Sequence, residues 1–129
     1  HVNLVSLFWD TVGDNMDQWR GVRIGNLSAT EVRRDYIHTH VIILQALGMA
    51  GKDLMSQFPN NWKTKIKNLK KINWLKNNPE WHQRVIVNGR VVKNSNSIIL
   101  AANLIKKALG ARLSVKEKAL ESNMKKNGK

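Results

Sequence analysis

The sequence predicts a mainly α-helical fold of about five helices with one short β-hairpin at residues 84–93. Three observations lead to this fold class. Apolar residues recur at intervals of three and four over most of the chain, as they do on the buried side of a helix. Two Ser-x-x-Glu patterns are typical of helix starts, and a single Asn-Gly pair lies between two short β-branched runs. A length of 129 residues, 42% of them hydrophobic, suits one domain over residues 1–129.

Two helices are expected in the first half of the chain. An amphipathic helix reaches from the N-terminus to about Trp19 and precedes a glycine-containing loop. A second helix begins at Ser28, the first residue of a capping box, and ends before Pro59. Gly48 and Gly51 lie inside this helix, so either another helix packs closely there or the helix bends or breaks.

Three more helices are expected in the second half. Residues 61–72 form a basic amphipathic helix, and residues 97–109 form a helix that Gly110 closes. A last helix begins at the second capping box, Ser114. The final two helices also permit a helix-turn-helix interpretation of residues 97–124.

Charge is distributed unevenly along the chain. Residues 1–53 have 5 Lys+Arg and 6 Asp+Glu, a net charge of −1. Residues 54–116 have 13 Lys+Arg and one acid, Glu80, a net charge of +12, and the remaining 4 Lys and 2 Glu give +2. This asymmetry favours nucleic acid as the partner and an anionic membrane surface as the second candidate; a solubilising surface is the alternative.

The lysine-rich segment is predicted to contact DNA phosphates, because lysine binds phosphate without recognising bases. The lysines concerned are Lys63, Lys67, Lys70 and Lys71. Three tryptophans lie within or near this segment and are expected in the core, with base stacking as the alternative. They are Trp62, Trp74 and Trp81.

The hairpin is a second candidate DNA contact. Asn88-Gly89 favours a two-residue type I′ turn, because both turn positions need a positive φ. A two-stranded ribbon can enter a DNA groove, where Arg90 is the expected base-reading residue. The candidate contact residues are Arg84, Arg90, Lys93 and Asn94. The alternative is an ordinary β-wing on a helical domain.

A polar cluster lies in the predicted second helix. Its members are Arg33, Arg34, Asp35, His38 and His40. On a regular helix Asp35 and His38 are neighbours, so the carboxylate can orient the imidazole, whereas His38 and His40 point apart and cannot share a metal. Bracing against another part of the protein is favoured over ligand contact, and ligand contact over catalysis.

Several classes of site are not expected. The chain has no cysteine, so disulfides and thiolate metal sites are excluded. We find no apolar run of about 20 residues, no secretory pattern, no phosphate-binding glycine loop and no catalytic motif. No catalytic residue, metal or cofactor is therefore predicted.

Several segments together resemble the C-terminal part of the DndB family of DGQHR-domain proteins. They are Arg33-Arg34-Asp35-Tyr36-Ile37-His38-Thr39-His40, Leu44-Gln45-Ala46-Leu47-Gly48, the spacing of Trp74, Asn78 and Trp81, Asn88-Gly89-Arg90-Val91-Val92-Lys93-Asn94-Ser95, and Ile105-Lys106-Lys107-Ala108-Leu109-Gly110. The resemblance covers roughly residues 4–120. Asn73 departs from it, since an acidic residue is expected before Trp74.

The resemblance implies a cytoplasmic bacterial protein linked to DNA phosphorothioation, in which sulfur replaces a non-bridging phosphate oxygen. Family members are described as DNA-binding transcriptional regulators of the modification genes. The motif that names the DGQHR domain would lie upstream, so the chain is expected to be a C-terminal fragment. The leading hypothesis is a DNA-binding regulatory module. The alternatives are a docking domain that completes the upstream domain, binds a protein partner or forms a homo-oligomer, and a segment that completes an upstream catalytic site.

Overall fold

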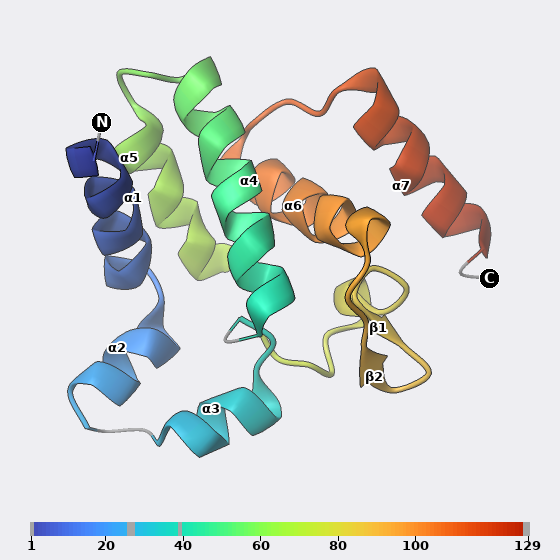
Figure 1. Cartoon of the computed structure of the whole chain (residues 1–129), viewed down its shortest axis with the longest axis horizontal. Helices are drawn as coiled ribbons and strands as arrows, with labels where there is room; N and C mark the ends of the chain where they lie inside the picture. The colour runs from blue at the N-terminus through green and yellow to red at the C-terminus, as the bar shows by residue number, and fades with distance from the viewer. Residues whose placement is uncertain (1, 26–27, 39, 128–129) are drawn as a thin grey trace.

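The computed structural model describes residues 2–25, 28–38 and 40–127. Within these ranges the chain forms seven α-helices, two 3₁₀-helices and one two-stranded antiparallel sheet (Figure 1). The mainly helical fold with one hairpin is therefore confirmed, although the prediction of about five helices was too low.

The elements follow one another in a simple order. They are α1 (Val2–Asp14), α2 (Asp17–Arg23), α3 (Ala29–Asp35), α4 (Val41–Gln57), α5 (Trp62–Ile66), η1 (Lys67–Lys71), η2 (Pro79–Trp81), β1 (Ile86–Val87), β2 (Arg90–Val91), α6 (Ser95–Leu109) and α7 (Val115–Asn127).

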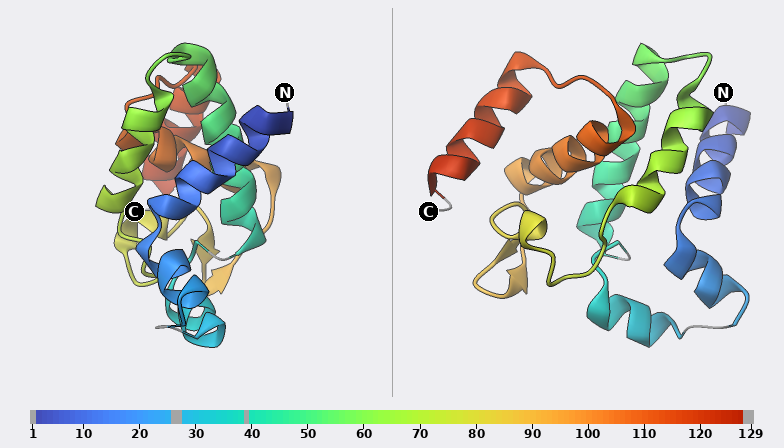
Figure 2. Two further views of the ribbon diagram at one scale, coloured as in Figure 1. Left: turned by 90° about the vertical axis from the view of Figure 1, so that its left-hand side faces the viewer. Right: turned by 180° about the vertical axis from the view of Figure 1, so that it is seen from behind.

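Helices α4 and α6 pack against each other at the centre of the molecule. Helices α1 and α5 lie on one side of this pair, and α7 lies on the other side against α6 (Figures 1 and 2). The core is apolar and continuous across these helices, with Ile43, Leu47, Leu54 and Ile105 at 0–2% exposure. The buried faces of α4 and α6 thus form the centre of the core.

The predicted N-terminal helix is interrupted at residues 15 and 16. The Asn15 side chain donates to the Thr11 carbonyl oxygen at 2.9 Å, and this local bond competes with continuation of the helix. Met16 takes an extended conformation (φ −115°, ψ 96°) and is fully buried. Helix α2 then begins and includes Gly21 of the predicted glycine loop, whereas Gly25 lies in the turn after the helix with φ 85°.

The predicted second helix is also interrupted, but not at its glycines. Ser28 caps α3 by accepting from the Glu31 amide at 3.1 Å, as predicted, and α3 ends at Asp35. The backbone then pairs with a distant loop. The Ile37 amide donates to the Trp74 carbonyl at 2.8 Å, and the Lys76 amide donates to the Asp35 carbonyl at 3.0 Å. These long-range bonds replace helical ones, which a helical sequence pattern cannot reveal.

The hairpin and the last helices agree with their sequence signals. Asn88 and Gly89 have φ of 53° and 77°, and Ile86 pairs with Val91, so the two-residue turn is confirmed. The paired strands are shorter than residues 84–93 because the Val85 amide bonds back to the Trp81 carbonyl. Gly110 closes α6 with φ 84°. Ser114 and Glu117 form the predicted capping box, each side chain accepting from the other's amide at 3.2 and 2.7 Å.

Gly51 allows α1 to approach α4 closely, which is the first of the two alternatives for the helix glycines. A Cβ at this position would lie 2.2 Å from Cζ of the buried Phe8 ring. At Gly48 the nearest atom, in Trp9, would lie 3.9 Å away, an ordinary contact.

We expect Gly51→Ala to lower the free energy of unfolding by about 1–3 kcal/mol, because the Phe8 ring must move out of a packed core. Gly48→Ala is the matched control on the same helix, and it should be neutral or stabilising by up to about 1 kcal/mol. Urea denaturation of both variants measures the difference. Equal effects would contradict the close approach of Phe8 to Gly51.

Candidate nucleic-acid interface

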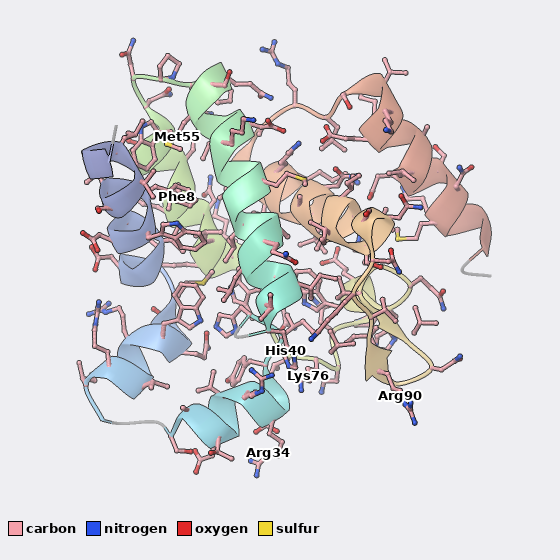
Figure 3. The ribbon with its side chains drawn as sticks, in the orientation of Figure 1. Phe8, Arg34, His40, Met55, Lys76 and Arg90 are labelled. Carbon is pink, nitrogen blue, oxygen red and sulfur yellow. The ribbon has the colours of Figure 1, made fainter. Side chains whose placement is uncertain are left out.

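Six of the predicted contact cations lie on the surface without a carboxylate partner. Each is exposed, and none forms an ion pair with any residue in the described ranges. They are Lys63, Lys67, Lys70, Lys71, Arg90 and Lys93. Figure 3 shows the Arg90 side chain pointing away from the body of the molecule. Unpaired cations of this kind are available to a polyanion.

The amphipathic pattern of α5 and η1 places the lysines outside. Trp62, Ile66 and Leu69 are 5%, 1% and 0% exposed and fix the buried side of the segment. The lysines between them must therefore point outward. Lys63 has its Nζ 5.9 Å from the Trp62 ring centroid, so the ammonium lies near an aromatic surface. The segment is thus a rigid platform for exposed lysines.

Arg84 does not lie on this exposed surface. It is 7% exposed, and its Nη1 and Nη2 donate to the Glu121 carboxylate at 2.5 and 2.7 Å. Nη1 also donates to the Leu100 carbonyl at 2.8 Å. Arg84 therefore connects the segment before the hairpin to α6 and α7. Sequence reasoning missed Glu121, which is 37 residues away.

A second buried ion pair connects the same helices. Lys106 of α6 is fully buried and pairs with Asp53 of α4 and with Glu117 of α7 at 2.6 Å. Burial alone would lower the pKa of Lys106, but the hydrogen bonds to both carboxylates outweigh it and raise the pKa above its usual value. Glu121 is likewise desolvated, yet its bonds to Arg84 and Lys107 lower its pKa to about 2. Glu121 therefore stays ionised at neutral pH.

Asn94 has a local role. Its side-chain oxygen accepts from the Ser97 amide at 2.8 Å and caps α6. Asn94 itself is exposed, and it lies at the surface next to Lys93. The cap fixes the direction in which the chain leaves the hairpin.

The polar cluster Arg33–His40 is not helical beyond Asp35, so the predicted pairing of Asp35 with His38 is wrong. Asp35 is exposed and pairs with Arg34 at 3.0 and 3.1 Å. His38 instead lies inside the protein with 0% exposure, and its Nε2 is 3.0 Å from Oε1 of Gln18. The extended backbone after Asp35 sends the two side chains to different environments. His38 is therefore buried, as bracing against another part of the protein requires, whereas Asp35 is exposed.

His38 is part of a column of stacked rings. Its ring lies between Trp19 and Trp74, with centroids 5.9 and 5.1 Å away, and Trp74 stacks on Trp81 at 5.7 Å. Burial lowers the pKa of His38 to about 4. Trp74 and Trp81 are 5% and 0% exposed, so their predicted core role is confirmed and neither is available for base stacking.

His40 lies at the start of α4 among positive charges. Its Nε2 is buried without a hydrogen-bond partner. Burial lowers its pKa, and three nearby cations lower it further: Lys76, Arg33 and Lys93. Figure 3 shows His40 and Lys76 side by side below α4. Lys76 was not selected as a candidate residue from the sequence. Only the fold brings it, together with Arg33 and Lys93, close to His40.

No group of three metal-ligating side chains is found in residues 2–25, 28–38 and 40–127. In the same ranges, no helix combines the length and apolar character that a membrane crossing needs.

A family model described as DndB, DNA-sulfur modification-associated, matches residues 1–112. The chain belongs to the DndB family. The resemblance noted in the sequence is thereby confirmed, and the match includes the exposed lysines, the hairpin and α6. Helix α7 lies beyond the matched residues. No curated protein and no solved structure matches this chain.

Proposed function

We propose that this DndB-family chain is a DNA-binding regulatory module of a bacterial, cytoplasmic DNA phosphorothioation system, and that it regulates transcription of the modification genes. The observation that supports the proposal most is the set of six exposed, unpaired cations on α5, η1 and the hairpin, in a family associated with DNA sulfur modification. The lysines contact phosphates and position the protein on the duplex.

The hairpin is the proposed base-reading element. Arg90 is exposed beside a tight turn, and a guanidinium can pair bidentately with guanine in the major groove. Lys93 follows on the same ribbon and is suited to an adjacent phosphate. Phosphate contacts would therefore supply affinity, and Arg90 would supply preference for a sequence.

We expect DNA affinity to fall steeply with salt. If about five cations engage phosphates, log affinity against log salt should have a slope of about −4 to −5, with a Kd on the order of 10⁻⁴–10⁻⁶ M for random duplex at physiological salt. Changing Lys67, Lys70 and Lys71 together to Gln should weaken all duplexes similarly and make the slope shallower by about 2 to 3. Fluorescence anisotropy at several salt concentrations measures both quantities.

The matched control changes three exposed lysines elsewhere, Lys52, Lys118 and Lys125, to Gln, which gives the same change in net charge. Its slope should stay close to that of the unchanged chain. Arg90→Ala should cost more on a promoter of the modification genes than on a scrambled duplex. A folded chain that binds no duplex at low salt would exclude the DNA hypothesis.

The second candidate function is docking, either on the rest of a longer chain, on a protein partner or on a second copy. It is favoured by apolar residues exposed on α1, where Leu4 and Val5 are 43% and 51% exposed. Together with Phe8 and Met55 they line a groove between α1 and α4 (Figure 3). Self-association of the unaltered chain that is lost in a Leu4→Ser, Val5→Ser double variant would support docking. If neither of these two proteins binds DNA, docking is favoured over DNA binding.

A further inference from the structure

The Glu121 carboxylate of α7 lies in a cradle of donors from three side chains. Arg84 donates twice, at 2.5 and 2.7 Å, Lys107 donates at 2.8 Å, and Asn103 donates at 3.2 Å. Arginine and lysine directed at one anion form the donor set that proteins also use for phosphate, since a guanidinium fork pairs bidentately with either group.

Two of the three cradle residues, Arg84 and Asn103, lie within the body of the protein. Arg84 is 7% exposed and is also held by the Leu100 carbonyl at 2.8 Å, while Asn103 is fully buried in α6. The Nε of Arg84 is buried without a partner. Glu121 therefore leaves one donor of the cradle unused.

Helix α7 has few apolar contacts to hold it in place. Glu121 is the only buried side chain among residues 115–125, and Val115 is 87% exposed. The second attachment is also ionic, from Glu117 to Lys106 at 2.6 Å. A helix attached mainly through carboxylates can be displaced by a competing polyanion.

The cradle adjoins the exposed basic surface. A surface hollow is lined by three cations, Arg84, Lys107 and Lys71 of η1, and by one acid, Glu80. Helix η1 packs against α6, so the cradle residues of α6 and the lysines of η1 lie on adjoining elements. A phosphate in the cradle would lie on the same side of the protein as a backbone that follows the lysines of η1.

We propose that Arg84, Asn103 and Lys107 form an anion site for a nucleic-acid backbone phosphate, and that the Glu121 carboxylate of α7 occupies this site when DNA is absent. The inference builds on the proposed DNA-binding function and adds a competition to it. Helix α7 is an intramolecular competitor that must leave the cradle before the phosphate enters. The cradle lies inside the residues that match the DndB family, whereas its occupant lies beyond them.

Hydrogen exchange of the unaltered 129-residue chain tests the displacement without any mutation. Amides of α7 should lose protection when saturating duplex DNA is added at low salt, while those of α4 and α6 keep theirs. Binding of DNA with unchanged α7 protection would overturn the competition and leave the proposed function standing. Absence of DNA binding would overturn both.

A charge-matched pair of variants tests the cradle itself. Glu121→Gln keeps a hydrogen-bond acceptor but releases the cations, whereas Asp10→Asn makes the same charge change at an exposed residue of α1. Because no carboxylate then competes for the cradle, Glu121→Gln should raise affinity at least about threefold above Asp10→Asn at the same salt concentration. Equal gains in the two variants would overturn the site.

Lys107 then reports whether the gain arises in the cradle. Lys107→Gln should have little effect on DNA affinity in the unaltered chain, where Glu121 neutralises the lysine, and should remove most of the gain in the Glu121→Gln background. The same loss in both backgrounds would mean that Lys107 contacts DNA independently of Glu121, which contradicts the proposal.

Discussion

Arg84→Ala is expected to lower the free energy of unfolding by about 3–5 kcal/mol, one of the largest effects of any single substitution in this chain. The Glu121 side chain is 6% exposed, so removing its bidentate partner leaves a buried carboxylate with only Lys107 and Asn103 as donors. The Leu100 carbonyl loses its donor as well. Urea denaturation followed by circular dichroism measures the loss.

Two control experiments distinguish the loss of this buried ion pair from a general effect of removing a positive charge. Arg90→Ala removes an exposed arginine from the hairpin and should change stability by no more than about 0.5 kcal/mol. Replacing both partners by apolar residues, as Arg84→Met with Glu121→Leu, should recover most of the loss, because no uncompensated charge stays buried. A cost below about 1 kcal/mol for Arg84→Ala would mean that solvent enters this contact freely.

The elements that the sequence predicts well depend on neighbouring residues. Asn88-Gly89 specifies its turn because the two residues themselves tolerate positive φ, and Ser114 with Glu117 specifies a helix start through bonds three residues apart. The exposed lysines of α5 and η1 were also predictable, since their apolar neighbours repeat at helical spacing. Local chemistry was sufficient in each case.

The elements that the sequence did not predict depend on distant residues. The interruption after Asp35 exists because Ile37 bonds to Trp74, far along the chain. Arg84 was predicted as a DNA contact because the hairpin signal places it near a sharp turn, yet its partner Glu121 is 37 residues away. His38 was predicted beside Asp35 on one helix, and its position in the stack depends on where Trp19 and Trp74 meet. None of these contacts has a periodic signature.

Between pH 7 and pH 4 the folded chain is expected to lose on the order of 3 kcal/mol of stability through His38 alone. Burial lowers its folded pKa to about 4, against 6.5 in an exposed histidine. Between these two values the unfolded chain binds the proton and the folded chain does not, so stability falls as the pH falls through this window. Glu121 contributes to the pH dependence only at lower pH. Its pKa in the folded chain is about 2, so its contribution to stability is lost only as the pH falls below the ordinary glutamate value of 4.5.

His38→Phe should flatten this pH dependence, because phenylalanine keeps a ring between Trp19 and Trp74 but cannot take up a proton. Some slope should remain from His40, whose pKa burial also lowers. His82→Gln, at an exposed position, is the control and should keep the full slope. Urea denaturation followed by tryptophan fluorescence at several pH values from 7 to 4 measures each slope. An unchanged slope in His38→Phe would show that this histidine gains its proton without opening the ring column, since a charged imidazole can be stabilised by the two indole faces that enclose it.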